Sequence, residues 1–174
     1  RRYIDFVAGL AVNNVGHRNK TVLKAISDQM EQYLHIIPYG EFVQAPQVKL
    51  AKHLAQLLPD HLDRSYFVNS GTEAVEAALK LAKRHTGRRK IVAYHKSYHG
   101  STHGSLSVSG NPIKRPAFEP LLPEVQFITL NEINDLQQIT ESTAAVIIET
   151  IQGDAAVRFP THIYLSALRK RCDE

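Results

Sequence analysis

The first third of the chain carries apolar residues at helical spacing. One run predicts a helix over residues 21–34. A second predicts a helix that begins near Pro46, a residue suited to the first turn, and ends before Pro59. The apolar positions are Val22, Ile26, Met30 and Tyr33 in the first run and Val48, Ala51, Leu54, Ala55 and Leu58 in the second. Ahead of both, residues 3–14 mix aromatic, β-branched and small side chains, which predicts a short strand and turn before a helical segment.

Beyond residue 64 the pattern changes to strands and helices in alternation. Strands are predicted at residues 65–68, 90–94, 125–130 and 144–148, and helices at residues 72–85, 133–139 and 163–172, the last with Thr161 as its N-cap. The run from Ala144 to Ile148 is apolar throughout, which is typical of a strand buried on both faces. The helix over residues 72–85 is apolar on almost all sides and is expected to pack closely on its neighbours. This alternation predicts an α/β fold with a mostly parallel sheet and flanking helices.

Composition and charge narrow the class of protein. With 174 residues, of which 43% are hydrophobic and 22% charged, the chain has the composition of a globular domain. Its net charge of +4 is spread along the chain, so nucleic acid is not an expected partner. No apolar stretch approaches the roughly 20 residues of a membrane helix, and the residues at the start of the sequence predict no leader. Cys172 is the single cysteine, so no internal disulfide is expected. No membrane association is therefore expected, and the predicted location is cytoplasmic.

The segment from Asn69 to Glu73 is the strongest candidate for a binding site. Ser70 and Glu73 have the spacing of a capping box, and Gly71 lets the backbone come close to a ligand. The amides of Gly71 and Thr72, with the hydroxyls of Ser70 and Thr72, are placed to hold a phosphate at the positive end of the helix dipole. The alternative is an ordinary capped helix, which local spacing alone favours. The segment lacks the lysine of a P-loop and the glycine spacing of a dinucleotide-binding motif.

The segment after the second predicted strand holds Tyr98 among three histidines. His95, His99 and His103 recur at every fourth residue, a spacing that indicates a metal site when it falls on one helix. Gly100 and its Ser and Thr neighbours disfavour a continuous helix, and no acidic residue or cysteine completes a ligand set, so no metal is expected. An aromatic ring beside a histidine at the carboxyl end of a strand is better suited to stacking on a flat cofactor or substrate. A purely structural role for Tyr98 is the remaining alternative.

Glu149 follows the last predicted strand, and Gln152 and Gly153 come shortly after it. A carboxylate seldom ends a fully apolar strand inside a domain unless a partner meets it. Two interpretations of Glu149 remain: a carboxylate at a solvated strand end, or a residue of a binding site. A serine hydrolase is disfavoured, because no nucleophile elbow is present and Ser70 has no assignable base.

Together these segments resemble the class III aminotransferases, the ornithine and omega-amino-acid family, over nearly the whole chain. The matching segments are, in chain order, residues 3–6 through Gly16-His17 and Ala25-Ile26, residues 69–81, Tyr98-His99-Gly100, and Glu149 with Gln152-Gly153. The resemblance implies pyridoxal 5'-phosphate as the cofactor. Gly71 and Thr72 would then hold its phosphate, Tyr98 would stack on its ring, and Glu149 would line the substrate side. Ser70 and His99 are counted with them as cofactor-binding residues.

The resemblance also implies the large domain of the type I pyridoxal-phosphate fold. Residues 1–44 are expected to belong to the small domain, and residues 45–174 to the first part of the cofactor-binding large domain, truncated at its C-terminal end. The family's Schiff-base lysine, the aspartate at its pyridine nitrogen and a threonine from the partner subunit have no counterpart here. We therefore interpret the sequence as a piece of a longer protein, without a catalytic residue and inactive alone. The complete protein is expected to be a homodimer.

By the same resemblance, the reaction moves an amino group from an amine or omega-amino acid (acetylornithine, ornithine or aminobutyrate) to a 2-oxo acid. Ser101, Leu10 and Gln152 are the candidate substrate-binding residues. Ser101 stands where these members usually carry Arg for a substrate carboxylate, and Leu10 stands where ornithine-specific members carry Tyr. Both departures weaken those three assignments. Another reaction of the same fold, such as a semialdehyde aminomutase, and a non-catalytic module are the alternatives.

Overall fold

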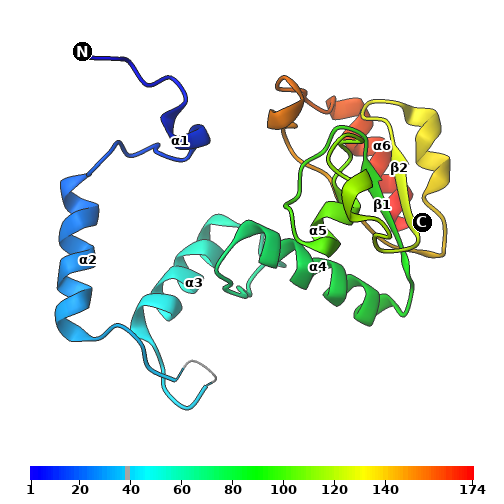
Figure 1. The fold of residues 1–174 in the computed structure, drawn as a ribbon. Helices are drawn as coiled ribbons and strands as arrows, with labels where there is room; N and C mark the ends of the chain where they lie inside the picture. The colour runs from blue at the N-terminus through cyan, green and yellow to red at the C-terminus, as the bar shows by residue number, and fades with distance from the viewer. Residues whose placement is uncertain (38–39) are drawn as a thin grey trace. The chain divides into compact units, whose positions relative to one another are not determined.

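The computed structural model describes residues 1–37 and 40–174, which form two compact units, Arg1–Ser65 and Tyr66–Glu174. The units are described separately below, and Figure 1 shows the elements of each. The domain boundary expected after residue 44 concerns a complete enzyme and stays a prediction.

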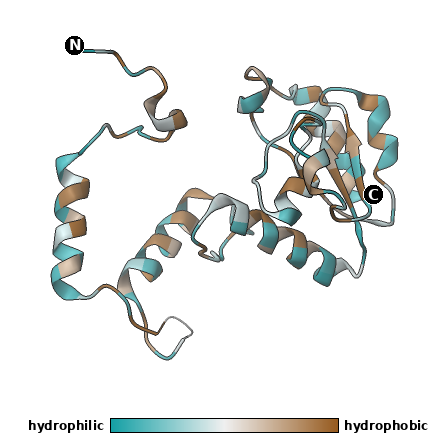
Figure 2. Ribbon diagram, viewed as in Figure 1, coloured by the Kyte–Doolittle hydropathy of each residue, from teal (hydrophilic) through white to brown (hydrophobic). Residues whose placement is uncertain are grey.

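The first unit consists of helices joined by irregular segments. Helix α2 spans Lys20–Gln32 and α3 spans Ala45–Leu57, close to the predicted bounds. The side chain of Asn19 caps α2 by accepting hydrogen bonds from the amides of Thr21 and Val22, 3.0 and 3.3 Å away. Colouring by hydropathy shows apolar and polar sides on both helices, as their spacing predicted (Figure 2).

The prediction of a strand within residues 3–14 is wrong. The segment instead contains the short element α1, Ala8–Ala11, in which Gly9 and Leu10 have left-handed backbone angles. Asp5 Oδ1 accepts hydrogen bonds from the amides of Val7 and Ala8, both at 3.0 Å. A side chain that bonds its own nearby backbone competes with extended pairing, and the mixed residue types of this segment gave no sign of that competition.

The second unit is built on three parallel strands. They are β1, Lys90–Tyr94; β2, Val125–Ile128; and β3, Thr143–Val146, in the order β2-β1-β3. Residues of β1 pair in register from Ile91 opposite Val125 to Tyr94 opposite Ile128. The pairing of β1 with β3 is also parallel. The expected α/β fold with a parallel sheet and flanking helices is confirmed.

The central strand β1 alternates between two apolar cores. Ile91 and Ala93 face Leu79 of helix α4, Gly71–Thr86, and Val108 of helix α5, His103–Val108. The other face of β1 packs against α6, His162–Asp173, and the 3-10 helix η2, Ile133–Gln138. That core consists of Val92, Tyr94, Ile128, Leu130, Leu136, Ile139, Tyr164 and Leu168. Helices therefore cover both faces of the sheet, and the parallel pairing places the carboxyl ends of the three strands at one edge.

Several predicted elements of this unit differ from the structure. Residues 65–68 form no strand, because no neighbouring backbone pairs with them, and Tyr66 is 82% exposed. Residues 133–139 form a 3-10 rather than an α-helix, and β3 is shorter than expected and only partly buried. The prediction that α4 packs closely on almost all sides is also wrong. Among the described residues of α4 only Leu79 is buried, and Leu81 is 68% exposed. The sequence did not predict α5.

Candidate functional site

The N-terminus of α4 presents backbone amides without partners. Ser70 Oγ caps the helix by accepting from the Glu73 amide at 3.3 Å, while Glu73 Oε2 accepts from the amide of Asn69 at 2.7 Å. In the expected capping box, Glu73 would accept from the amide of Ser70; here it accepts from the amide of Asn69, one residue earlier. Within the described ranges, the amides of Gly71 and Thr72 have no hydrogen-bond partner. Free amides at the positive end of a 16-residue helix make this end suitable for an anion.

The hydroxyl of Thr72 points to α5. Its Oγ1 lies 2.8 Å from Thr102 Oγ1 and 2.6 Å from Ser105 Oγ. Glu76, one turn further along α4, accepts hydrogen bonds at Oε1 from Thr102 Oγ1 at 2.5 Å and from the amides of Gly104 and Ser105 at 2.9 and 3.1 Å. Residues four apart lie on one helix face, so the Thr72 and Glu76 spacing could have been noticed in the sequence, but α5 itself was not predicted.

Two glycines permit this close approach of α4 and the segment before α5. Gly100 has a φ of +126°, and a Cβ there would collide with Thr72 Oγ1 and come within 2.7 Å of Ser105 Oγ. A Cβ on Gly104 would collide with the Glu76 carboxylate. The glycines therefore let the loop after β1 lie directly against the start of α4.

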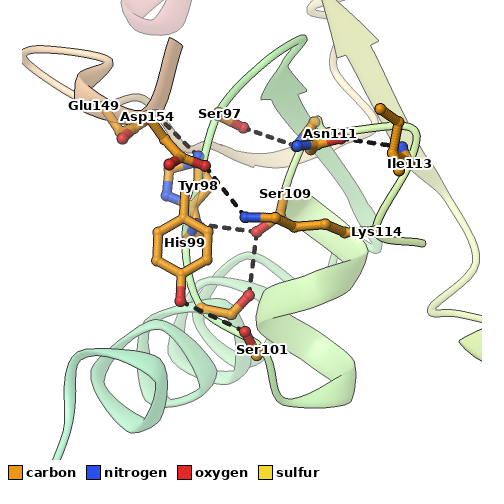
Figure 3. A network of polar contacts seen from close by, with 12 residues as sticks. Ser97, Tyr98, His99, Ser101, Ser109, Asn111, Ile113, Lys114, Glu149 and Asp154 are labelled. Carbon is orange, nitrogen blue, oxygen red and sulfur yellow. Dashed lines mark hydrogen bonds and ion pairs between the residues drawn. The ribbon is translucent and has the colours of Figure 1, made fainter. Parts of the chain in front are cut away.

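Tyr98 lies in the loop after β1, with its side chain 45% exposed. Its amide donates a hydrogen bond to Glu149 Oε2 at 3.1 Å, and its hydroxyl is 3.5 Å from Ser101 Oγ. Lys114 Nζ lies 5.1 Å from the centre of the Tyr98 ring and forms an ion pair of 3.3 Å with Asp154 (Figure 3). Three segments distant in sequence thus meet around one accessible aromatic ring, an arrangement that suits stacking.

His99 is half-buried beside this ring. Its amide donates to Ser109 Oγ at 2.9 Å, whereas its Nε2 is buried and has no partner in the described part of the chain. Burial lowers the pKa of the His99 imidazole below its usual value. The ring is therefore held in its neutral form more strongly than an exposed histidine, and one nitrogen is left for an additional partner.

Glu149 is half-buried as well, and the pKa of its carboxyl is raised. Burial is the largest cause, the hydrogen bond from the Tyr98 amide acts in the opposite direction, and the nearby charge of Asp154 raises the pKa further. The solvated strand end that the sequence left open is thus not what is observed, because the carboxylate anchors the loop of Tyr98.

The remaining predicted residues lie in different settings. Gln152 is fully buried, its Nε2 donates to the His95 carbonyl at 3.2 Å, and its Oε1 has no partner among the residues that the structure describes. Ser101 is exposed next to Tyr98. Leu10 is 84% exposed and belongs to the first unit, so nothing relates it to this site. Sequence reasoning missed Glu76, Ser105 and Lys114, all of which act through long-range contacts.

His95, His99 and His103 do not lie on one helix. His95 is in the turn after β1, and His103 is the first residue of α5. Across the described ranges no group of three or more His, Cys, Asp or Glu side chains is arranged to hold a metal ion. In the same part of the chain, none of the helices combines the length and the apolar character that crossing a membrane requires.

A parallel sheet with free amides at a helix N-terminus and an accessible aromatic ring beyond its central strand is typical of cofactor-binding α/β proteins. The family model described as aminotransferase class-III matches residues 1–174, and the chain belongs to this family. Pyridoxal 5'-phosphate is the cofactor of the family, as the sequence resemblance implied, and one similar structure is of an amine transaminase from an uncultivated Pseudomonas species in the PLP-bound form.

Two curated relatives illustrate the match. The chain is 43% identical to an acetylornithine aminotransferase of Methanopyrus kandleri, covering 99% of this chain and 44% of that protein. It is 45% identical to a [LysW]-aminoadipate semialdehyde/glutamate semialdehyde transaminase of Sulfurisphaera tokodaii, covering 98% of this chain and 43% of that protein. The chain thus spans less than half the length of these relatives.

The fold is shared with solved transaminases. A transaminase from the marine bacterium Virgibacillus matches with a TM-score of 0.92 at 27% identity, covering 98% of this chain and 43% of that one. An omega-transaminase from Thermomicrobium roseum matches with a TM-score of 0.90 at 29% identity, covering 99% of this chain and 46% of that one. These matches agree with the large-domain fold expected from the resemblance.

The observed donors suit pyridoxal phosphate. Its phosphate needs several hydrogen-bond donors, and two free amides stand at the start of α4. Its flat ring needs an aromatic partner, and Tyr98 exposes one. The buried Nε2 of His99, without a partner among the described residues, is a further polar atom available to a ligand.

Proposed function

We propose that this chain forms the phosphate-binding and ring-binding part of a pyridoxal-phosphate-dependent aminotransferase that moves an amino group from an amine or omega-amino acid to a 2-oxo acid. The observation that carries the proposal is the pair of free amides at Gly71 and Thr72, placed next to the loop of Tyr98. A phosphate and an aromatic ring at these two places match the two ends of the cofactor.

Each residue has a distinct part in this proposal. Gly71 and Thr72 donate amide hydrogen bonds to the phosphate, and the Ser70 hydroxyl lies at the same helix end. Tyr98 covers one face of the ring, and His99 offers its free nitrogen beside it. When bound, pyridoxal phosphate draws electrons away from the substrate carbon that loses its proton. The protein residues named here bind and orient; they do not transfer that proton.

Glu149 is proposed to act on the substrate side. Its Oε2 accepts the Tyr98 amide, and its raised pKa reflects a half-buried carboxyl. A carboxylate in this setting holds the aromatic loop in place and at the same time disfavours other negative groups beside it. We propose that it thereby restricts which part of a substrate can approach the ring.

The substrate class is proposed from the relatives and the nearby residues. The relatives named above act on acetylornithine or on semialdehydes of amino acids, which supports an omega-amino-acid donor. Ser101 is exposed next to the Tyr98 hydroxyl and is proposed to face the substrate. Gln152 is buried, so its proposed role is through its free Oε1 only. Leu10 remains a proposed substrate residue of the first unit.

The wider setting of the enzyme is also a proposal. We propose a homodimer in the cytoplasm, with the cofactor-bound lysine supplied by sequence outside these 174 residues. A polypeptide limited to these residues is then inactive. Expressing it alone and detecting amino transfer with added pyridoxal phosphate would contradict this part of the proposal.

The test of the function is an assay of the complete natural protein with pyridoxal phosphate and a panel of amino donors. The donors are acetylornithine, ornithine, 4-aminobutyrate and a simple amine, each with 2-oxoglutarate or pyruvate as acceptor. We expect donor-dependent changes in cofactor absorbance together with formation of the amino acid product. Movement of an amino group within one semialdehyde substrate, with no acceptor consumed, would instead identify an aminomutase. No absorbance change with any donor would reject amino transfer.

A further inference from the structure

Two helix N-termini meet at the proposed phosphate site, and only one of them is free. Thr72 in the first turn of α4 and Thr102, the N-cap of α5, lie 2.8 Å apart at their hydroxyl oxygens. The Glu76 carboxylate occupies the start of α5 by accepting the amides of Gly104 and Ser105. The start of α4 keeps its free amides. A carboxylate of the chain itself therefore fills the competing helix end.

The same carboxylate fixes the Thr72 hydroxyl through its neighbours. Thr102 Oγ1 must donate its proton to Glu76, because a carboxylate has none to give. Ser105 is fully buried, and its hydroxyl lies 2.6 Å from Thr72 Oγ1. In its 2.8 Å contact with Thr72, Thr102 Oγ1 is then the acceptor, so the Thr72 proton is directed to Thr102. A bound phosphate would compete with Thr102 for that proton, and Ser105 can donate to Thr72 Oγ1 or to the Thr102 carbonyl. Gly100 and Gly104 let the backbone lie close enough for these contacts, because a Cβ at either position would collide with Thr72 or Glu76.

We propose that Glu76 is a positioning residue for the cofactor phosphate. It ties the first turn of α5 to α4, which holds Thr102 and Ser105 around Thr72 and fixes the direction of the Thr72 hydroxyl. This inference rests on the proposed function, because it takes the start of α4 as the phosphate site. Glu76 acts through Thr72 and does not touch the phosphate itself.

Glu76 should affect the binding of the phosphate end of the cofactor but not the binding of its ring. The ring end has its own anchors, since Glu149 holds the Tyr98 amide and Ser109 holds the His99 amide. Weakening Glu76 should therefore reduce the contribution of the phosphate to binding while leaving the contribution of the ring nearly unchanged. Pyridoxal, which lacks the phosphate, reports on the ring alone.

The experiment measures dissociation constants of pyridoxal 5'-phosphate and of pyridoxal for the complete natural protein and its variants, together with the 31P chemical shift of the bound phosphate. In Glu76→Ala we expect the preference for the phosphorylated ligand to fall about tenfold, the scale of one lost charge-assisted hydrogen bond. Glu76→Gln keeps a neutral acceptor and should lie between wild type and Glu76→Ala. The 31P shift should move in the same order.

Ser107→Ala is the matched control. Ser107 Oγ is also buried in α5 and bonded, to the His103 carbonyl and the Leu122 amide, but has no contact with Thr72. It should leave the preference and the 31P shift unchanged, and Glu76→Gln keeps the test available if Glu76→Ala fails to fold. Equal weakening of both ligands in the Glu76 variants would overturn the proposal.

An unchanged preference in the Glu76 variants overturns it too, and Thr72→Val then decides how far the failure reaches. If Thr72→Val lowers the preference, the phosphate site stands and only the role of Glu76 is lost. If Thr72→Val also has no effect, the start of α4 is not the phosphate site and the proposed function fails as well.

Discussion

The backbone amide of Tyr98 donates a hydrogen bond to Oε2 of Glu149 over 3.1 Å, which joins the loop after β1 to the segment after β3. These two strands are neighbours in the sheet, so their carboxyl ends lie at the same edge. A side-chain carboxylate that anchors a backbone amide can hold a loop without any regular secondary structure. The position of the aromatic ring is thus set by a residue 51 positions further along the chain.

Thr72→Val should weaken binding of pyridoxal phosphate by about 1 to 3 kcal/mol, because one hydroxyl donor to a charged group is lost. The measurement is the cofactor dissociation constant in the complete protein. Thr86→Val is the matched control at the other end of α4, where the hydroxyl donates to the Ala82 carbonyl and accepts from the Arg88 amide. An unchanged constant in Thr72→Val, or an equal loss in Thr86→Val, would contradict the prediction.

Tyr98→Phe should retain most activity, whereas Tyr98→Ala should lose cofactor affinity. The reason is that the ring supplies stacking area, while the hydroxyl makes only a 3.5 Å contact with Ser101. Cofactor titration and initial rates of both variants test this. Tyr66→Ala removes another exposed ring of the same unit and should have no effect on affinity. Equal damage from Tyr98→Phe and Tyr98→Ala would point to the hydroxyl instead.

His99 should make the protein less stable as the pH falls below about 6.5, the ordinary value for histidine. Burial lowers the pKa of His99 in the folded state, so in this window the unfolded chain binds the proton and the folded chain does not. Its stabilising contribution is present above the ordinary pKa and is lost as the pH falls towards the lowered value. His99→Gln should remove that part of the slope of unfolding free energy against pH. An NMR titration that places the pKa of His99 at or above the ordinary value would contradict this.

Glu149 should give a slope of the opposite sign in a more acidic window. Burial raises the pKa of Glu149, so the folded state holds the proton more tightly than the unfolded chain. Its contribution to stability is present below the ordinary pKa of 4.5 and is lost as the pH rises through the raised value. Glu149→Gln keeps an acceptor for the Tyr98 amide but cannot ionise. Its unfolding free energy relative to wild type should therefore increase across this window, and a constant difference would show that the pKa is not raised.

Gly110→Ala should destabilise the protein by about 1 to 3 kcal/mol or more, the usual cost of overpacking. A Cβ at Gly110 would collide with the Tyr94 carbonyl and come within 2.7 Å of the Lys96 amide nitrogen, and backbone atoms cannot move aside. Gly153→Ala is the control, since a Cβ there meets nothing within 4 Å. Urea unfolding of both variants provides the measurement, and similar midpoints for the two would refute the steric argument.

Local chemistry explains what the sequence predicted well. The helix from Gly71 to Thr86 follows from its Ser70 cap, its apolar spacing and the left-handed Gly87 after it. The bounds of β1 follow from a short apolar run ended by a turn. The alternation of strands and helices was enough to predict that the strands pair in parallel. Each of these signals lies within a few residues and needs no distant partner.

The failures share one physical cause, which is that the deciding contact lies far away in sequence. Residues 65–68 have the side chains of a strand but no paired neighbour. Helix α5 contains Gly and Ser, which are poor helix formers, and Glu76 on another helix satisfies its first amides. Propensity predicts such elements wrongly because it does not include tertiary hydrogen bonds.

By itself the sequence determined the parallel α/β arrangement, the cap and glycine at the start of α4, and the family to which the chain belongs. Only the tertiary structure decided which atoms of those residues are free and which are occupied. It directs the Thr72 hydroxyl to Thr102 and leaves the neighbouring amides open. Hydrogen-bond occupancy depends on elements packed from a distance, whereas caps, strands and motifs are encoded by adjacent residues.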